Sequence, residues 1–214
     1  TSTKSENNIS LDNIPPDVAA YYGSIDIIRY LYLQGINFNK NYWSYRHPVM
    51  YACMNGHLDV VEFLIENGAS VNFVCCFDKN SLLHYACMGG HGEVVKYLVE
   101  KGANTNAVNK EVLRPIIFAS ESGSFEAVKI LNELDPRANR NRLKYIPFVR
   151  AAACGHLDIV NFFLQQGVDI HIHEKDGTTA LSAACANNHP KVVSFLLSKI
   201  FSDDKNLDKA ALFH

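Results

Sequence analysis

Apolar positions recur along the chain in blocks that repeat about every 33 residues. Each block holds two short segments with helical spacing of small or aliphatic residues. In the second block, the segment 58–67 places Val60, Val61 and Leu64 along one apolar side, and Gly68 follows it. Glycine readily takes the left-handed conformation that closes a helix. Each block therefore predicts two short antiparallel helices.

The turn between the two segments sets the register of six copies. Successive turns are separated by 33, 34, 33, 32 and 33 residues. One helix pair cannot bury its own apolar face, so neighbouring copies must stack to cover it. The stretches between copies are short and rich in turn-forming residues, which predicts loops or two-stranded fingers. The turn positions are Gly23, Gly56, Gly90, Gly123, Gly155 and Asn188.

Two copies carry a recognisable family signature. They read HPVMYACMNGHLDVVEFLIENGASVN at 47–72 and SLLHYACMGGHGEVVKYLVEKGANTN at 81–106. Both resemble the ankyrin signature, with its Gly-His turn, paired valines and Gly-Ala-x-x-Asn end, and the second copy also keeps its Leu-His start. On these residues the chain is identified as a member of the ankyrin-repeat family. The resemblance implies an all-α ankyrin-repeat solenoid of stacked helix-turn-helix units, joined by β-hairpin-like fingers.

The pattern divides the chain into three parts. Residues 1–13 lack the repeat and predict a flexible N-terminal tail, whereas 14–200 hold the six repeats. Residues 201–214 predict either a C-terminal cap over the last apolar face or the start of a truncated seventh repeat. The end, ALFH, resembles the Leu-His opening of a further repeat. This favours the second alternative, which implies that the natural protein continues.

Composition narrows the function classes. The chain is 48% hydrophobic and 20% charged, as in a folded soluble protein, and its formal net charge is −2. This charge gives no overall attraction to nucleic acid or to an acidic membrane, so nucleic-acid binding is disfavoured. No apolar run reaches the roughly 18 residues that span a bilayer, which predicts no membrane insertion.

The cysteines predict packing rather than chemistry. Cys75 and Cys76 lie in a finger at a spacing that matches no established zinc site, so no metal is expected. A chain of this size can build its core without disulfides, and free thiols indicate a reducing compartment, that is, the cytoplasm or nucleus. Cys53, Cys87 and Cys185 lie three residues before a turn position and are expected to be small buried packing residues. Cys154 lies directly before a turn, and its repeat position also calls for no redox chemistry.

The histidines that follow the turns also occupy one shared repeat position. A shared position favours a structural hydrogen bond over catalysis. The sequence contains no phosphate-binding loop, no nucleophile with a plausible base and no cofactor motif. We therefore expect no enzyme activity and no cofactor in this segment. The four histidines are His57, His91, His156 and His189.

The resemblance implies that a protein or peptide binds across the fingers and first helices. Trp43 and Tyr45 lie in a polar run where no periodicity buries them, and exposed aromatics anchor interfaces. The alternative is that they cover the first two repeats as an N-terminal cap. The family positions give a row of candidate partner-binding residues: Tyr21, Tyr22, Trp43, Tyr45, Arg46, Tyr51, Met54, Phe77, Asp78, Tyr85, Met88, Lys110, Glu111, Leu113, Phe118, Arg140, Arg142, Tyr145 and Arg150.

Two local features add detail to this surface. The stretch 137–150 holds five basic and no acidic residues, which predicts acidic or phosphorylated groups on the partner; a solvated finger is the alternative. The resemblance also implies asparaginyl hydroxylation at finger asparagines, although hydrogen bonds within the turn explain these residues equally. The candidate asparagines are Asn39, Asn72, Asn106 and Asn139.

Three functions remain open from the sequence. The first is a non-enzymatic protein-protein interaction module that binds its partner on the concave surface. The second is a substrate-recognition or autoregulatory segment of a larger enzyme or secreted effector. The third is a structural spacer without a strong partner. The oligomeric state does not follow from the pattern.

Overall fold

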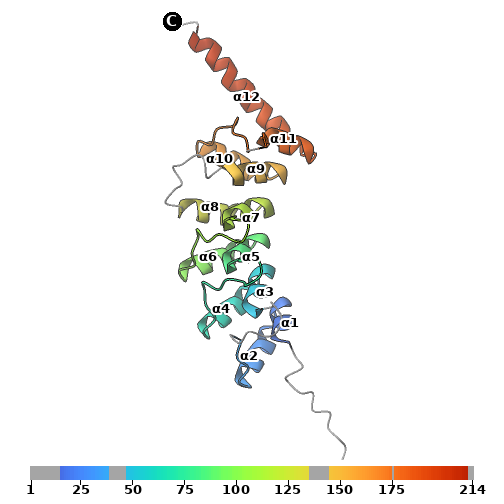
Figure 1. Cartoon of the computed structure of the whole chain (residues 1–214). Coiled ribbons are helices and arrows are strands. Elements are labelled where there is room, and N and C mark those ends of the chain that lie inside the picture. The colour runs from blue at the N-terminus through green and yellow to red at the C-terminus, as the bar shows by residue number, and fades with distance from the viewer. Residues whose placement is uncertain (1–14, 39–46, 135–144, 175, 212–214) are drawn as a thin grey trace, which may run out of the picture.

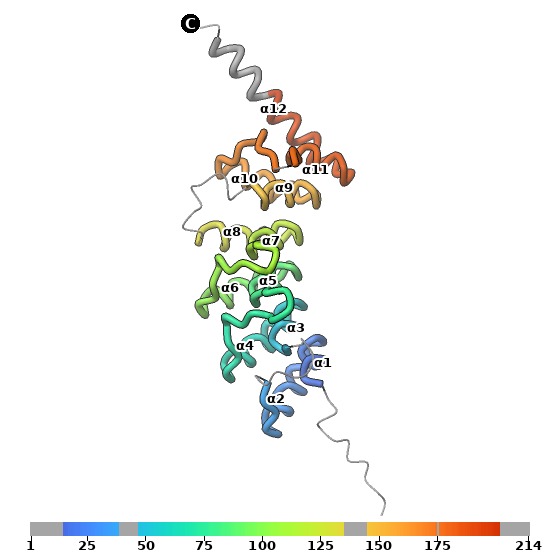
Figure 2. The backbone as a smooth tube through the Cα atoms, in the orientation of Figure 1, coloured from blue at the N-terminus to red at the C-terminus, as the bar shows by residue number. Residues whose placement is uncertain are grey.

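The structure is a computed structural model that describes residues 15–38, 47–134, 145–174 and 176–211, the side chains of 202–211 excepted. These residues form an elongated stack of helix pairs (Figure 1). The first helices of the pairs lie side by side in one layer and the second helices lie in another, as the backbone trace also shows (Figure 2). The all-α ankyrin solenoid expected from the sequence is confirmed.

Each repeat contributes one helix to each layer. The inner layer consists of α1 (Pro16–Tyr21), α3 (Pro48–Asn55), α5 (Leu82–Met88), α7 (Pro115–Ser122), α9 (Tyr145–Ala153) and α11 (Ala180–Ala186). The outer layer consists of α2 (Ile25–Leu33), α4 (Leu58–Glu66), α6 (Gly92–Glu100), α8 (Phe125–Glu133), α10 (Leu157–Gln165) and α12 (Pro190–Ala211). Each described inner helix packs on the next one along the chain.

The turns between the helices of a pair use left-handed backbone. All five glycines at the turn positions have positive φ, for example +76° at Gly56. In the last repeat Asn188 takes this place with φ of +58°, which asparagine tolerates better than most residues. The finger connections contribute little β-structure: in the described part of the chain, the isolated bridges are Val74 with Ser81 and His173 with Thr179.

Small inner-helix residues and aliphatic outer-helix residues form the core between repeats. Ala52, Cys53 and Val61 are fully buried, and so is Cys87 one repeat further on. Small side chains let neighbouring inner helices approach closely, while the outer helices supply the apolar volume. Both cysteines therefore have the packing role predicted for them.

The other two repeat cysteines are exposed. The prediction that Cys185 is a buried packing residue is therefore wrong, whereas for Cys154 no burial was predicted. Cys185 has the same repeat position as Cys53, but no further inner helix packs on α11 in the described part of the chain. The register of a residue thus predicts its burial only where a neighbouring repeat covers it.

In three repeats, the histidine after the turn binds the repeat before it. The Nε2 atoms of His57, His91 and His156 each donate a hydrogen bond to a backbone carbonyl in the preceding repeat, at 2.9, 3.1 and 2.9 Å. The acceptors are the carbonyls of Tyr21, Met54 and Glu121. The structural role predicted for these three histidines is confirmed.

The C-terminal helix α12 runs without a break from Pro190 to Ala211. It therefore crosses residue 200, the predicted boundary between the sixth repeat and the last segment. Both alternatives for residues 201–214 stay predictions. The proposed tail at 1–13 lies outside the described residues.

Gly56→Ala is expected to destabilise the stack more than Gly102→Ala. Both glycines have positive φ, which costs an alanine about 1 kcal/mol. A Cβ at Gly56 would also collide with the His91 ring and break its hydrogen bond, a further loss of about 1 kcal/mol, whereas a Cβ at Gly102 meets nothing within 4 Å. Urea denaturation of the two variants measures the difference, and equal losses would contradict the histidine-glycine contact.

Candidate functional site

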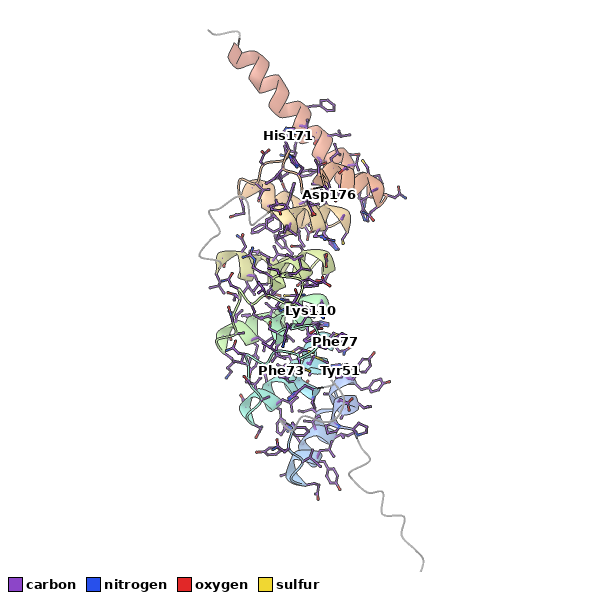
Figure 3. The ribbon with its side chains drawn as sticks, in the orientation of Figure 1. Tyr51, Phe73, Phe77, Lys110, His171 and Asp176 are labelled. Atoms are coloured by element: carbon purple, nitrogen blue, oxygen red, sulfur yellow. The ribbon has the colours of Figure 1, made fainter. Side chains whose placement is uncertain are left out.

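The candidate site is the surface formed by the inner helices and the fingers that lead into them. We call it the finger surface and define it by Tyr51 on α3, Phe77 in the second finger and Lys110 in the third. These three residues follow one another along the stack (Figure 3). Within the described residues, the finger surface comprises the fingers 73–81 and 107–114 and the end of α1.

The second finger is held by a carboxylate at its tip. Asp78 accepts hydrogen bonds from the backbone and side-chain nitrogens of Asn80, at 2.9 and 2.7 Å, and from the Tyr85 hydroxyl at 3.0 Å. Partial burial acts to raise the pKa of Asp78, but hydrogen bonds from Asn80, Tyr85 and Cys75 outweigh it and hold this pKa below its usual value. The carboxylate is thus engaged within the finger.

Tyr85 is a structural residue and not an exposed partner contact. Tyr85 is only 6% exposed, and its hydroxyl donates a hydrogen bond to the Asp78 carboxylate. Burial, followed by its interactions with Cys75 and Asp78, raises the pKa of Tyr85. The partner-binding prediction for Tyr85 is therefore corrected, because the position faces the finger of its own repeat.

Phe77 and Lys110 connect the second and third fingers. The Phe77 ring is 68% exposed, and Lys110 Nζ lies 5.9 Å from its centroid, within the range of a cation–π contact. The Lys110 backbone N–H donates to the Asp78 carbonyl oxygen at 2.8 Å. The backbone of one finger therefore fixes that of the next, and an aromatic and a cationic side chain stand together on the surface.

The third finger carries a strained residue that the sequence reasoning missed. Val112 has φ of +62° and is 73% exposed. A β-branched residue is seldom left-handed, and such strain persists only where the surroundings impose it. The Asn109 side chain does so by accepting from the N–H groups of Glu111 and Leu113 at 3.0 and 2.9 Å. The repeat register predicts left-handed backbone at this position, because Gly177 occupies the same position in the fifth finger and also has positive φ.

A buried histidine joins this finger to the repeat before it. His84 Nδ1 accepts from the Ser81 N–H at 3.0 Å, and His84 Nε2 donates to the Leu113 carbonyl at 3.0 Å. Burial lowers the pKa of His84, although the bond to the Leu113 carbonyl and the charge of Asp78 act the other way. The neutral ring therefore caps α5 and positions the third finger together.

Three tyrosines form an aromatic group at the N-terminal end of the finger surface. The Tyr21 ring stands edge-to-face with Tyr22 at 5.0 Å and with Tyr51 at 5.9 Å. Together with Asp17 and Val18 they line an open hollow of about 300 Å³. Tyr22 is 72% exposed, so the hollow is accessible to a partner.

The remaining candidates are divided between the core, the surface and the undescribed segments. Met54, Met88, Leu113 and Phe118 are partly buried against the core, which limits them to a partial contact. Arg150 is 44% exposed and lies 3.5 Å from Glu121, so it already has an acidic partner. Lys110 and Glu111 are exposed, and Tyr145 is half-buried. Trp43, Tyr45, Arg46, Arg140 and Arg142 lie outside the described residues.

Two of the candidate asparagines are described. Asn72 Oδ1 accepts from the Asn104 N–H at 2.9 Å, which links successive repeats, while the Asn106 N–H donates to Asn104 Oδ1 at 3.0 Å. Only the Asn72 bond is made by the side chain of a candidate asparagine, since Asn106 uses its backbone N–H here. Hydroxylation at Asn72 and Asn106 stays a prediction. Asn39 and Asn139 lie outside the described residues.

The described segments contain no group of side chains that could hold a metal ion and no helix that could cross a membrane. Across 15–38, 47–134, 145–174 and 176–201, no three His, Cys, Asp or Glu side chains are grouped as a metal site would require. None of the helices searched in the described residues combines the length and apolar character needed to cross a membrane.

Comparison with known families agrees with this geometry. The family described as ankyrin repeats, in three copies, matches residues 17–109, 49–142 and 148–214. These matches cover most of the chain, so the protein belongs to the ankyrin-repeat family. Ankyrin repeats are protein-interaction domains, and the partners they indicate are proteins.

Individual relatives match shorter parts of the chain. Two are from rice, Oryza sativa subsp. japonica: "Probable E3 ubiquitin-protein ligase XBOS33", 36% identical over 85 residues, and "Probable E3 ubiquitin-protein ligase XBOS32", 34% identical over 85 residues. Each match covers 38% of this chain, and 16% and 17% of the relatives. Alpha-latrotoxin-Lh1a of Latrodectus hasselti is 43% identical over 61 residues, 28% of this chain and 4% of the toxin. The chain therefore matches only a small part of each relative's length.

Asp78→Asn is expected to lower the free energy of unfolding by about 1–2 kcal/mol at pH 7, because an amide cannot accept all the bonds now made. The folded-state pKa of Asp78 is depressed, so its contribution is fully present above the unfolded pKa of about 3.9 and is lost as pH falls through the folded value.

Urea denaturation of the wild type and Asp78→Asn between pH 7 and about pH 3 tests this linkage. The difference in free energy of unfolding between the wild type and Asp78→Asn should become smaller below about pH 4. Tyr85→Phe, which removes one donor and keeps the carboxylate, should cost less at neutral pH. If this difference in free energy of unfolding stays constant from pH 7 to about pH 3, the charge of Asp78 does not stabilise the finger.

Proposed function

We propose that the chain is a non-enzymatic protein-protein interaction module that holds a peptide or protein segment on the finger surface. The observation that carries this proposal is the set of exposed apolar side chains on a backbone that is fixed by hydrogen bonds. Phe77 and Val112 are 68% and 73% exposed, yet their fingers are tied to each other and to the core. Side chains that are exposed and preorganised bind with little further loss of conformational entropy.

The strain at Val112 supports the same proposal. Left-handed valine costs stability, and its exposed side chain recovers little of that cost by burial in the isolated chain. Residues in such conformations cluster at ligand contacts, where the strain fixes a side chain in place. We infer that Val112 contacts the partner together with Phe77.

The finer features of the partner are part of the proposal. The basic stretch 137–150 suits acidic or phosphorylated groups, with Arg140 and Arg142 as their contacts. A reducing compartment, in the cytoplasm or nucleus, suits a chain whose six cysteines are all unpaired.

The second candidate is a substrate-recognition segment of a larger enzyme. The observation in its favour is that two rice relatives carry the name of E3 ubiquitin-protein ligases and are about six times as long as the aligned segment. In that arrangement the finger surface would hold the substrate, and the chemistry would reside in another part of the protein. Ubiquitin transfer by the natural full-length protein in a reconstituted assay would favour this candidate over the first.

Capture from a reducing cell lysate is the direct test of the interaction module. The wild type, Phe77→Ala and the Trp43→Ala, Tyr45→Ala double variant serve as baits, with Phe201→Ala as a matched control because Phe201 is 59% exposed on the outer helix α12. A protein retained by the wild type and the control but lost with Phe77→Ala supports the finger surface. Equal retention by all four baits would contradict it.

Val112→Gly should separate binding from stability. Glycine accepts φ of +62° without a Cβ penalty, so the urea midpoint should stay the same or rise. Loss of the exposed isopropyl group should weaken binding of the captured partner by about 1 kcal/mol, or roughly fivefold. Unchanged affinity would remove Val112 from the interface.

A further inference from the structure

We propose that the chain associates head to tail with further copies of itself, so that the first repeat of one copy packs on the sixth repeat of its neighbour. The contact continues the stack from one copy into the next. It goes beyond the finger surface and does not depend on it. The proposal follows from the residues that are uncovered at the two ends of the stack, from the fit of their turns and from their charges.

The first repeat exposes an apolar face that the later repeats bury. Ile27 on α2 is 42% exposed, whereas the residue at this position, four after the turn, is at most 1% exposed in the other five repeats. Tyr30 on the same helix is 49% exposed, whereas its counterparts Phe63 and Tyr97 are partly buried against the core. We call Ile27 and Tyr30 the N-terminal face. The buried counterparts of Ile27 are Val60, Val94, Ala127, Ile159 and Val192.

The sixth repeat leaves a second face open. Cys185 on α11 is exposed, whereas the residue three before the turn is fully buried in the other five repeats. Val193 on α12 is partly buried, whereas the residue five after the turn is fully buried in those repeats. We call Cys185 and Val193 the C-terminal face. The buried counterparts are Ala20, Cys53, Cys87, Ser120 and Ala152 for Cys185, and Ile28, Val61, Val95, Val128 and Val160 for Val193.

The two faces are the two sides of one contact. At each of the five junctions between described inner helices, a repeat is followed by another repeat, and the residues at both sets of positions are buried. The N-terminal and C-terminal faces lie at opposite ends of the stack, so one copy cannot bring its own two faces together (Figure 1). A second copy supplies the missing face in the register that the internal junctions already use.

The turns restrict which repeat can follow the sixth. At four turn glycines, an added Cβ would collide with the histidine ring of the following repeat. At Gly90, which is followed by Ser124 instead, the nearest atom to such a Cβ is 3.7 Å away, in Ser122. The sixth turn has Asn188, which carries a Cβ and has φ of +58°. A repeat that packs on it therefore needs a small residue after its own turn, and the first repeat has Ser24 there. The four glycines are Gly23, Gly56, Gly123 and Gly155.

The charges at the two ends agree with this fit. The third residue after the turn is acidic in the first five repeats, but it is Lys191 in the sixth. Inside the stack this position lies beside the preceding repeat, since a Cβ at Gly92 would meet the Glu126 carboxylate. The same stacking brings Asp26 of one copy to the turn region of the next copy, which carries Lys191. Asp26 and Lys191 are both exposed, and opposite charges favour this orientation over two identical ends.

Sedimentation velocity of the full 214-residue chain in reducing buffer is the first test. A head-to-tail contact leaves one open face at each end of every assembly, so growth continues past the dimer. The weight-average mass should therefore rise beyond that of a dimer as the concentration increases from about 5 to about 500 μM, with a dissociation constant for each contact of about 10–100 μM.

Ser24→His tests the fit between the turns. The new ring would meet the Cβ of Asn188 in the neighbouring copy, so association should weaken at least about tenfold. Adding Asn188→Gly recreates the histidine-glycine pair of the internal junctions and should restore association. Ser24→Ala is the matched control and should associate as the wild type does. The Ser24 side chain makes no capping bond to α2, and urea denaturation checks that each variant is folded.

Cys185→Arg tests the direction of the contact. Cys185 is exposed, so arginine fits the isolated chain but blocks the C-terminal face. Cys185→Arg and Ser24→His should each be monomeric alone. An equimolar mixture of the two should form a one-to-one dimer that grows no further, because each variant keeps the face that the other has lost.

Several results would overturn the proposal. A wild type that stays monomeric over the whole concentration range removes the contact, and one that stops at a dimer indicates two identical faces. Association that persists in Ser24→His, or that Asn188→Gly does not restore in that variant, would place the contact elsewhere. Since none of these variants alters the fingers, failure here leaves the interaction module untouched, and capture that fails with monomeric chain leaves the head-to-tail contact untouched.

Discussion

At three junctions between described repeats, the histidine that follows a turn donates its Nε2–H to a carbonyl of the preceding repeat and places its ring against the turn glycine of that preceding repeat. The contact needs a ring in one repeat and the absence of a Cβ in the other. Where it occurs, it ties the turn of one repeat to the turn of the next, beside inner helices that bury alanines and cysteines between them.

The same dependence extends from the core to the surface. His84 joins the third finger to α5, the Lys110 N–H joins it to the second finger, and Asp78 closes the second finger on Tyr85. At the N-terminal end, the His57 bond ends on the carbonyl of Tyr21, a wall of the aromatic hollow. The exposed side chains that we propose as partner contacts are therefore held by bonds that also hold the stack together.

The repeat pattern was sufficient to predict the helix pairs, which recur in every copy, and the role of the turn histidines, which recur in four of the six copies. It was insufficient where a residue's neighbours differ between copies. Tyr51 and Tyr85 share a register, yet Tyr51 lines an open hollow, whereas Tyr85 is buried and its hydroxyl donates to Asp78 in the second finger. Cys185 is exposed on α11, which packs on α9 but has no inner helix on its other side in the described part of the chain. The left-handed backbone at Val112 recurs at Lys79 and Gly177 in the same repeat position, so the repeat register encodes it although the hydrophobic pattern does not.

The central claim is that a preformed finger surface is where the partner binds. Amide hydrogen exchange of the chain with and without a captured partner tests it most directly. The account predicts that added protection falls on the fingers at 73–81 and 107–114, whose amides are already ordered, and leaves the outer helices α4 and α6 unchanged. Protection concentrated on α4 and α6 would contradict the account and place the interface on the opposite layer.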